Sequence, residues 1–142
     1  MPTDPDDVCL NKAAIIERTI RRMFEEFQAD PLLENFTHID ALTLNLERAC
    51  QAAIDLAMHL VAREHLGMPQ TGADAFRLLL GGKLITPQTA RDMVAMTGFR
   101  NIAIHQYREL DLSVLRAIVT DRWKSLVVFC GELGLDIRPR HQ

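Results

Sequence analysis

Side chains that could do chemistry are concentrated late in the chain, in the octapeptide RNIAIHQY at positions 100–107. Arg100 supplies a guanidinium that keeps its charge, His105 an imidazole that can change charge near neutral pH, and Tyr107 a phenol. A fixed cation can hold a phosphate, and an imidazole can accept or donate a proton. The octapeptide could therefore support phosphoryl chemistry without a metal ion, and we expect no metal site.

The spacing of the three side chains limits how they can meet. At about 100° per residue of helix, Arg100 and Tyr107 share a face, whereas His105 points about 140° away from Arg100. Either the helix deforms or ends near Ile104, or a second copy of the chain completes the site by two-fold symmetry. We favour a dimer, because phosphoryl transfer from a ribose needs a proton acceptor and a proton donor, and each octapeptide has one histidine.

Helices must position the octapeptide, because apolar residues recur at steps of three and four along most of the chain. Thr37, Thr71 and Thr86 have the form of helix N-caps, and Pro87 suits a first helical position. The expected helices cover about 10–29, 37–66, 71–80, 87 to the octapeptide, and 112–133. We expect one domain over residues 1–142, an all-α up-and-down bundle of four to five helices that dimerises, with residues 1–9 and 136–142 flexible.

Composition narrows the classes of function. The 142 residues carry 16 basic and 19 acidic side chains, so only a local cluster such as Arg18, Arg21 and Arg22 could contact nucleic acid. Three scattered cysteines without zinc-ligand spacing fit a reducing cytoplasm. An acidic N-terminus and the lack of an apolar run of about 20 residues argue against a signal peptide and a membrane span. We expect a soluble, cytoplasmic protein.

The residues around the octapeptide also resemble a known family. The run from Gly98 to Tyr107 is similar to the signature of the HepT family, toxins of the HEPN superfamily. Gln51–His59 is similar to the family's second-helix pattern, and Phe76–Leu79 and then Met93 follow in the expected order. The resemblance covers nearly the whole chain.

The resemblance implies a toxin that is a metal-independent endoribonuclease with no cofactor, paired with a nucleotidyltransferase antitoxin of the MntA type. Arg100 and His105 would be the catalytic pair: His105 would take the proton of a ribose 2′-hydroxyl, and Arg100 would neutralise the charge on the phosphorane. DNA lacks that hydroxyl and would survive. Asn101 would either contact the phosphate or hold the end of the helix.

In the family the antitoxin attaches AMP to the motif tyrosine, so the resemblance makes Tyr107 the candidate for AMPylation. An added nucleotide would place bulk and negative charge beside Arg100, where the phosphate of RNA would otherwise lie. Modification would then inactivate the toxin. An edge aromatic that packs against the last helix is the structural alternative for Tyr107.

Other residues have weaker claims to function. Asp55 and His59 are four apart on the second helix and form either a polar pair at an interface or a second shell that supports the motif. The cluster of Arg18, Arg21 and Arg22 is either a solvated face or part of an RNA-binding surface. An alternative function is a non-catalytic helical adaptor that dimerises, binds a nucleotide and docks a minimal nucleotidyltransferase.

Overall fold

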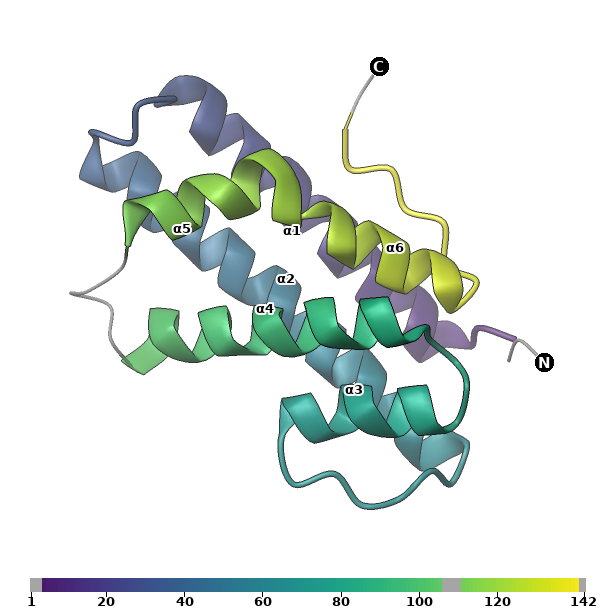
Figure 1. The fold of residues 1–142 in the computed structure, drawn as a ribbon. Helices are drawn as coiled ribbons and strands as arrows, with labels where there is room; N and C mark the ends of the chain where they lie inside the picture. Colours follow the sequence, from purple (N-terminus) through teal and green to yellow (C-terminus); the bar gives the residue numbers. More distant parts are fainter. Residues whose placement is uncertain (1–3, 106–110, 141–142) are drawn as a thin grey trace.

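The computed structural model describes residues 4–105 and 111–140, except the side chains of residues 100–105 (Figure 1). The described residues form helices and no strands, which confirms the all-α prediction. The elements are α1 (Asp7–Ala29), α2 (Phe36–Arg63), α3 (Gly72–Gly81), α4 (Pro87–His105), α5 (Leu112–Ala117), the π-helical turn η2 (Ile118–Arg122) and α6 (Lys124–Glu132). The elements α5, η2 and α6 follow one another along one continuous rod, which corresponds to the single helix predicted at 112–133. Each of the other four predicted helices corresponds to one observed helix.

Two long antiparallel helices, α1 and α2, form the base of the bundle (Figure 1). The α4 helix packs on α2 and α6, the η2 turn reaches α1, and the short α3 fills the corner between α2 and α4. No described helix is long and apolar enough to cross a lipid bilayer.

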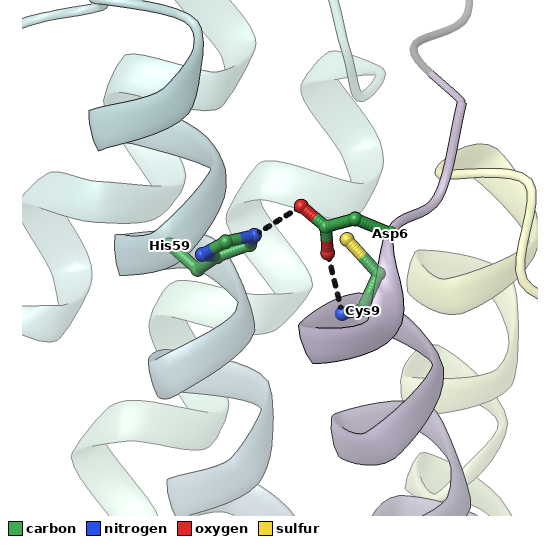
Figure 2. Close-up of side chains that lie close together, drawn as sticks. All are labelled: Asp6, Cys9 and His59. Atoms are coloured by element: carbon green, nitrogen blue, oxygen red, sulfur yellow. Dashed lines mark hydrogen bonds and ion pairs between the residues drawn. The ribbon is translucent and has the colours of Figure 1, made fainter.

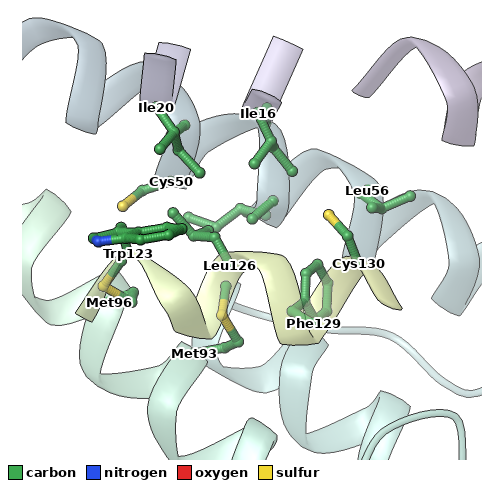
Figure 3. Close-up of a cluster of buried hydrophobic side chains, with 14 of the residues drawn as sticks. Ile16, Ile20, Cys50, Leu56, Met93, Met96, Trp123, Leu126, Phe129 and Cys130 are labelled. Carbon is green, nitrogen blue, oxygen red and sulfur yellow. The ribbon is translucent and has the colours of Figure 1, made fainter. Parts of the chain in front are cut away.

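The core is a continuous set of apolar side chains from every long element (Figure 3). Phe76 of α3 meets Phe129 of α6 edge to face, with ring centroids 5.3 Å apart. Trp123 lies near Cys50 and Met96 in Figure 3 and makes an edge contact with Phe24 of α1. These ring contacts link α6 to α3 through Phe129, and link Trp123, which directly precedes α6, to α1.

The start of α4 is tied to the end of α6 by one carboxylate. Glu132 accepts hydrogen bonds from the Thr86 backbone N–H at 2.8 Å and from the hydroxyls of Thr86 and Thr89 at 3.1 and 2.8 Å. A negative charge at a helix N-terminus also suits the helix dipole. Thr86 caps α4 and Pro87 is its first residue, as predicted.

Some residues near both ends of the chain are packed in the core. The α1 helix begins at Asp7 with Asp6 as its N-cap, and Cys9 is 1% exposed. Near the other end Ile137 is buried, and the Arg138 backbone N–H donates to Glu17 at 2.6 Å. Of these residues Cys9 and Ile137 are buried in the core, whereas Val8 and Asp136 are exposed. The expectation of flexible segments at 1–9 and 136–142 stays a prediction.

Two local features differ from prediction. Asn35, rather than Thr37, caps α2: its side-chain oxygen accepts the Thr37 backbone N–H at 2.9 Å. The η2 turn was not predicted. It buries Ile118 and Val119 and interrupts the regular α geometry of the last rod.

Candidate active site

The α4 helix positions the octapeptide. Its inner side buries Met93, Met96 and Phe99, and its outer side exposes Arg91, Ala95 and Gly98. The helix is unbroken from Pro87 to His105, so Arg100, Asn101 and His105 all lie within it. Of the two alternatives for bringing the motif together, a helix that ends near Ile104 stays a prediction, because α4 is described as far as His105 and the residues that follow lie outside the described part.

The register of α4 separates positions 100 and 105. Position 100 follows Met93 by seven residues and so falls on the same side of the helix as Met93, which is 1% exposed. Position 105 follows Gly98 by seven residues and falls on the exposed side. A β-carbon added at Gly98 would meet nothing within 4 Å. The two positions therefore lie on different sides of one straight helix.

The side chains of Arg100, Asn101 and His105 lie outside the described part, and Tyr107 lies outside the described residues altogether. What the structure supplies is the helix that carries the first three residues, the register of that helix, and its surroundings.

A cavity of about 330 Å³ runs beside α4 toward the motif. One wall comes from α4, including Asp92, Met96 and Phe99, and the other comes from α5 and η2, including Ile118 and Arg122. Phe99 immediately precedes Arg100. The cavity therefore lies next to position 100, and its described lining is mainly apolar, with one acidic and one basic side chain.

Asp55 and His59 lie at the interface of α2 with α1, but each takes its own partner. Asp55 accepts hydrogen bonds from Gln51 at 2.8 Å and from Lys12 at 3.5 Å, and His59 Nε2 is 2.7 Å from Asp6 Oδ2. Figure 1 places the start of α1, which they contact, at the opposite end of α4 from His105. This location favours the interface role and gives no support to a second shell for the motif.

Asp6, Cys9 and His59 form a compact cluster whose possible ligand atoms lie within 4.8 Å of one another (Figure 2). Arg63 occupies the same region: its guanidinium donates to Asp6 Oδ2 at 3.0 Å and lies 3.9 Å from Cys9 Sγ. A bound cation would have to displace that charge. The cluster is better explained as a tether between the start of α1 and the end of α2.

Charge and burial set the protonation of this tether. Hydrogen bonds from the Cys9 backbone N–H and from His59 hold the pKa of the Asp6 carboxyl well below its usual range. Burial raises the pKa of the Cys9 thiol. The carboxylate stays charged and accepts three hydrogen bonds, while the thiol stays neutral and is a poor nucleophile.

The predicted arginine cluster divides in the structure. Arg21 donates to the Arg138 carbonyl at 3.1 Å, and Arg22 pairs with Glu25 and with Glu26. Arg18 is exposed on the side of α1 that faces Arg48 across a groove. Sequence reasoning missed Arg48, and the periodicity of α2 was the signal that could have found it, since it places Leu44, Arg48 and Asp55 off the buried stripe.

The fold and the motif together define a class, an all-helical HEPN domain with Arg-x4-His near the end of its fourth helix. The chain belongs to the HepT-like family: a sequence model of the family described as Ribonuclease HepT-like matches residues 13–133. The match begins within α1, runs through the end of α6 and includes the whole octapeptide.

Individual relatives agree with the family. The mRNA nuclease HepT of Shewanella oneidensis is 38% identical over 115 residues, which cover 80% of this chain and 86% of that protein. The tRNA nuclease HepT of Aphanizomenon flos-aquae is 29% identical over 90 residues, which cover 63% of this chain and 61% of that protein.

Solved structures extend the similarity to the fold. A tri-AMPylated HEPN toxin of Shewanella oneidensis in complex with MNT antitoxin has a TM-score of 0.86 and 34% identity, covering 92% of this chain and 98% of that one. A toxin–antitoxin structure with AMP-PNP also has a TM-score of 0.86 and 34% identity, covering 91% and 98%.

Proposed function

We propose that this chain is the toxin of a toxin–antitoxin pair and cuts RNA endonucleolytically without a metal ion. The observation that carries the proposal is the Arg-x4-His-x-Tyr octapeptide at the end of α4 in a chain whose family match spans residues 13–133. Relatives of this fold are an mRNA nuclease and an AMPylated toxin in complex with an antitoxin. Such a toxin would act in the cytoplasm, where its RNA substrate is.

In the proposed reaction His105 accepts the proton of a ribose 2′-hydroxyl, and the freed oxygen attacks the adjacent phosphorus. Arg100 neutralises the charge that gathers on the phosphorane oxygens. The bond from phosphorus to the 5′-oxygen then breaks, and that oxygen takes a proton from a second imidazole. The products are a 2′,3′-cyclic phosphate and a 5′-hydroxyl. Asn101 contributes either a phosphate contact or support for the helix end.

A homodimer would supply the second imidazole. Position 105 lies on the same side of α4 as the exposed small residues Ala95 and Gly98. Small residues let another helix approach closely, so two copies could meet along this side and bring their histidines together. Position 100 faces the core of its own protomer, and each active site would combine groups from two chains.

The partner that restrains the toxin would be a nucleotidyltransferase of the MntA type that attaches one or more AMP groups to Tyr107. A phosphodiester on Tyr107 would bring negative charge to the end of α4 and compete with the phosphate of RNA for Arg100. Modification would block substrate binding without any change of fold.

The cleavage test uses purified, unmodified protein with RNA in excess chelator, beside His105→Ala and Arg100→Ala. Wild type should cut RNA, leave DNA of the same sequence intact, and yield cyclic phosphate ends, while both variants lose at least about 100-fold in rate. Equal cleavage by all three would rule out this motif as the active site. No cleavage by any of them would favour the non-catalytic adaptor.

The test of AMPylation uses intact mass of protein coexpressed with its antitoxin. We expect increments of AMP size that disappear in Tyr107→Phe. Increments that persist in Tyr107→Phe would refute Tyr107 as the acceptor.

A further inference from the structure

A groove of about 600 Å³ runs between α1 and α2 and gathers positive charge. Four cationic side chains line it, three from α1 and one from α2, against a single carboxylate among the described lining residues, Asp55. The cationic residues are Lys12, Arg18, Arg22 and Arg48. This local excess is opposite in sign to the formal charge of the chain, which is −3.

Two of these cations have no partner among the residues that the structure describes. The other two cations have partners: Lys12 Nζ lies 3.5 Å from Asp55 Oδ2, and Arg22 forms ion pairs with two glutamates of its own helix. Arg18 and Arg48 are both exposed and make no hydrogen bond or ion pair within the part of the chain that the structure describes. An unpaired arginine keeps its full capacity to bind a phosphate with two parallel hydrogen bonds.

The cations form a row. Along α1, Arg18 and Arg22 are one turn or about 6 Å apart, and Lys12 lies about 15 Å from Arg22. Arg48 faces this row from α2, and Ile15, Leu44 and Ala52 provide an apolar floor between the two helices. A row of charges along an open groove suits a chain of regularly spaced anions better than one small ion.

We propose that the α1–α2 groove binds the phosphate backbone of single-stranded RNA outside the cleavage site, with Arg18 and Arg48 as the main contacts. The identity of the ligand as RNA rests on the proposed function, whereas the anion-binding character rests on the groove itself. A second copy of the chain is a poor occupant of the groove. A two-fold interface would place the row of cations of one copy against the same row of the other copy, and the like charges would repel each other.

The binding test compares wild type with Arg18→Ala/Arg48→Ala. The matched control is Arg77→Ala/Lys124→Ala, which removes two exposed cations from α3 and α6, outside the groove. The probe is a fluorescent RNA oligonucleotide methylated at every 2′-oxygen, which lacks the attacking hydroxyl, and its anisotropy is measured over a series of salt concentrations.

The groove variant, Arg18→Ala/Arg48→Ala, should bind the RNA probe with a Kd about tenfold higher than that of wild type. The slope of the logarithm of the binding constant against the logarithm of the salt concentration should fall in magnitude by about 1.4, as expected for two lost phosphate contacts to a single strand. The control should bind like wild type. With cleavable RNA the groove variant should show a higher KM and an unchanged kcat, because the catalytic pair remains.

Equal Kd values for the groove variant and the control would overturn the proposal. A change in oligomeric mass of the groove variant would also overturn it, by marking the groove as a protein interface. Failure of the proposed function gives a different result, since wild type would then leave natural RNA uncut. Groove-dependent binding of the methylated probe would still support the anion site in that case.

Discussion

At the scale of single residues, the most consequential position beside the motif is Gly98. It lies on the exposed side of α4, and a β-carbon added there would meet nothing within 4 Å. Glycine in the middle of a helix costs about 1 kcal/mol relative to alanine. The described residues of the protomer give no packing reason for this glycine, which is consistent with a closely approaching second copy.

Gly98→Arg should therefore leave the protomer folded but disrupt the dimer and reduce RNA cleavage at least about tenfold. Gly131→Arg is a matched control, because Gly131 is also an exposed helical glycine whose added β-carbon would meet nothing within 4 Å. Light scattering and the rate of RNA cleavage report the two effects. A Gly98→Arg protein that stays dimeric and fully active would remove this side of α4 from the proposed interface.

At the scale of elements, two side-chain links hold the helix ends in place. Glu132 connects the end of α6 to the first turn of α4, and Asp6 connects the first turn of α1 to His59 and Arg63 of α2. Both carboxylates lie at helix N-termini, where the unpaired backbone N–H groups and the helix dipole favour negative charge.

The Asp6 link predicts a specific acid sensitivity. Its pKa is lowered in the folded state, so its contribution to stability is complete above the ordinary carboxyl pKa of about 4 and is lost as the pH falls toward the folded value. Asp6→Asn should lower the free energy of unfolding at pH 7, and the difference from wild type should shrink between pH 4 and pH 2, as followed by urea denaturation.

Asp7→Asn is the control for that prediction, because Asp7 is an exposed carboxylate one residue further along α1. Its effect should be smaller at pH 7. If the difference between wild type and Asp6→Asn stayed constant down to pH 2, ionisation of Asp6 would not be the source of the stabilisation.

The sequence predicts the elements well where their signals are local. Thr71 and Thr86 cap helices as expected, because each hydroxyl needs only a backbone N–H three residues away. The packed residues near the chain ends and the bond from Glu132 to Thr86 depend on contacts between distant residues, which periodicity cannot give. The η2 turn did leave a signal in the sequence. The buried residues Leu115, Val119 and Trp123 are separated by two successive steps of four, which suits a turn with more residues than an α turn.

The candidate site was predictable in part for the same reason. The face shared by residues seven apart follows from helix geometry alone, and α4 confirms the helix through His105. Asp55 and His59 had the correct spacing for a pair, yet each has a partner on or just before α1 that the sequence could not reveal. Arg48 became part of the basic groove only when α1 and α2 were packed together.

At the scale of the whole molecule, the described part of the protomer has a continuous hydrophobic core, whereas under the proposed function its active site needs a second copy of the chain. Its core includes side chains from all the long helices, so folding does not require a partner in order to bury the main apolar stripe. The helix that carries the motif nevertheless presents positions 100 and 105 on different sides. Association would then serve catalysis more than stability.

Mixing two inactive variants tests which groups of the active site come from each chain. Arg100→Ala and His105→Ala protomers, unfolded and refolded together, form mixed dimers that hold only one His105 between them. Because the proposed reaction uses a second imidazole as the proton donor, the mixture should stay at the activity of the separate variants. Recovery of up to about a quarter of wild-type activity would show that one histidine with an arginine from the other chain is enough at each site.

The η2 turn also has an evolutionary consequence. A π turn holds one residue more than the α turn it replaces, so it behaves as a single-residue insertion absorbed inside a helix. Losing one residue from Ile118–Arg122 would restore regular α geometry and leave Leu115 seven residues, or about two α turns, before Trp123. Leu115, which is fully buried, would then keep its side of the rod and stay in the core. A one-residue deletion that would rotate one half of an ordinary α-helix by about 100° against the other half can therefore be tolerated at this turn.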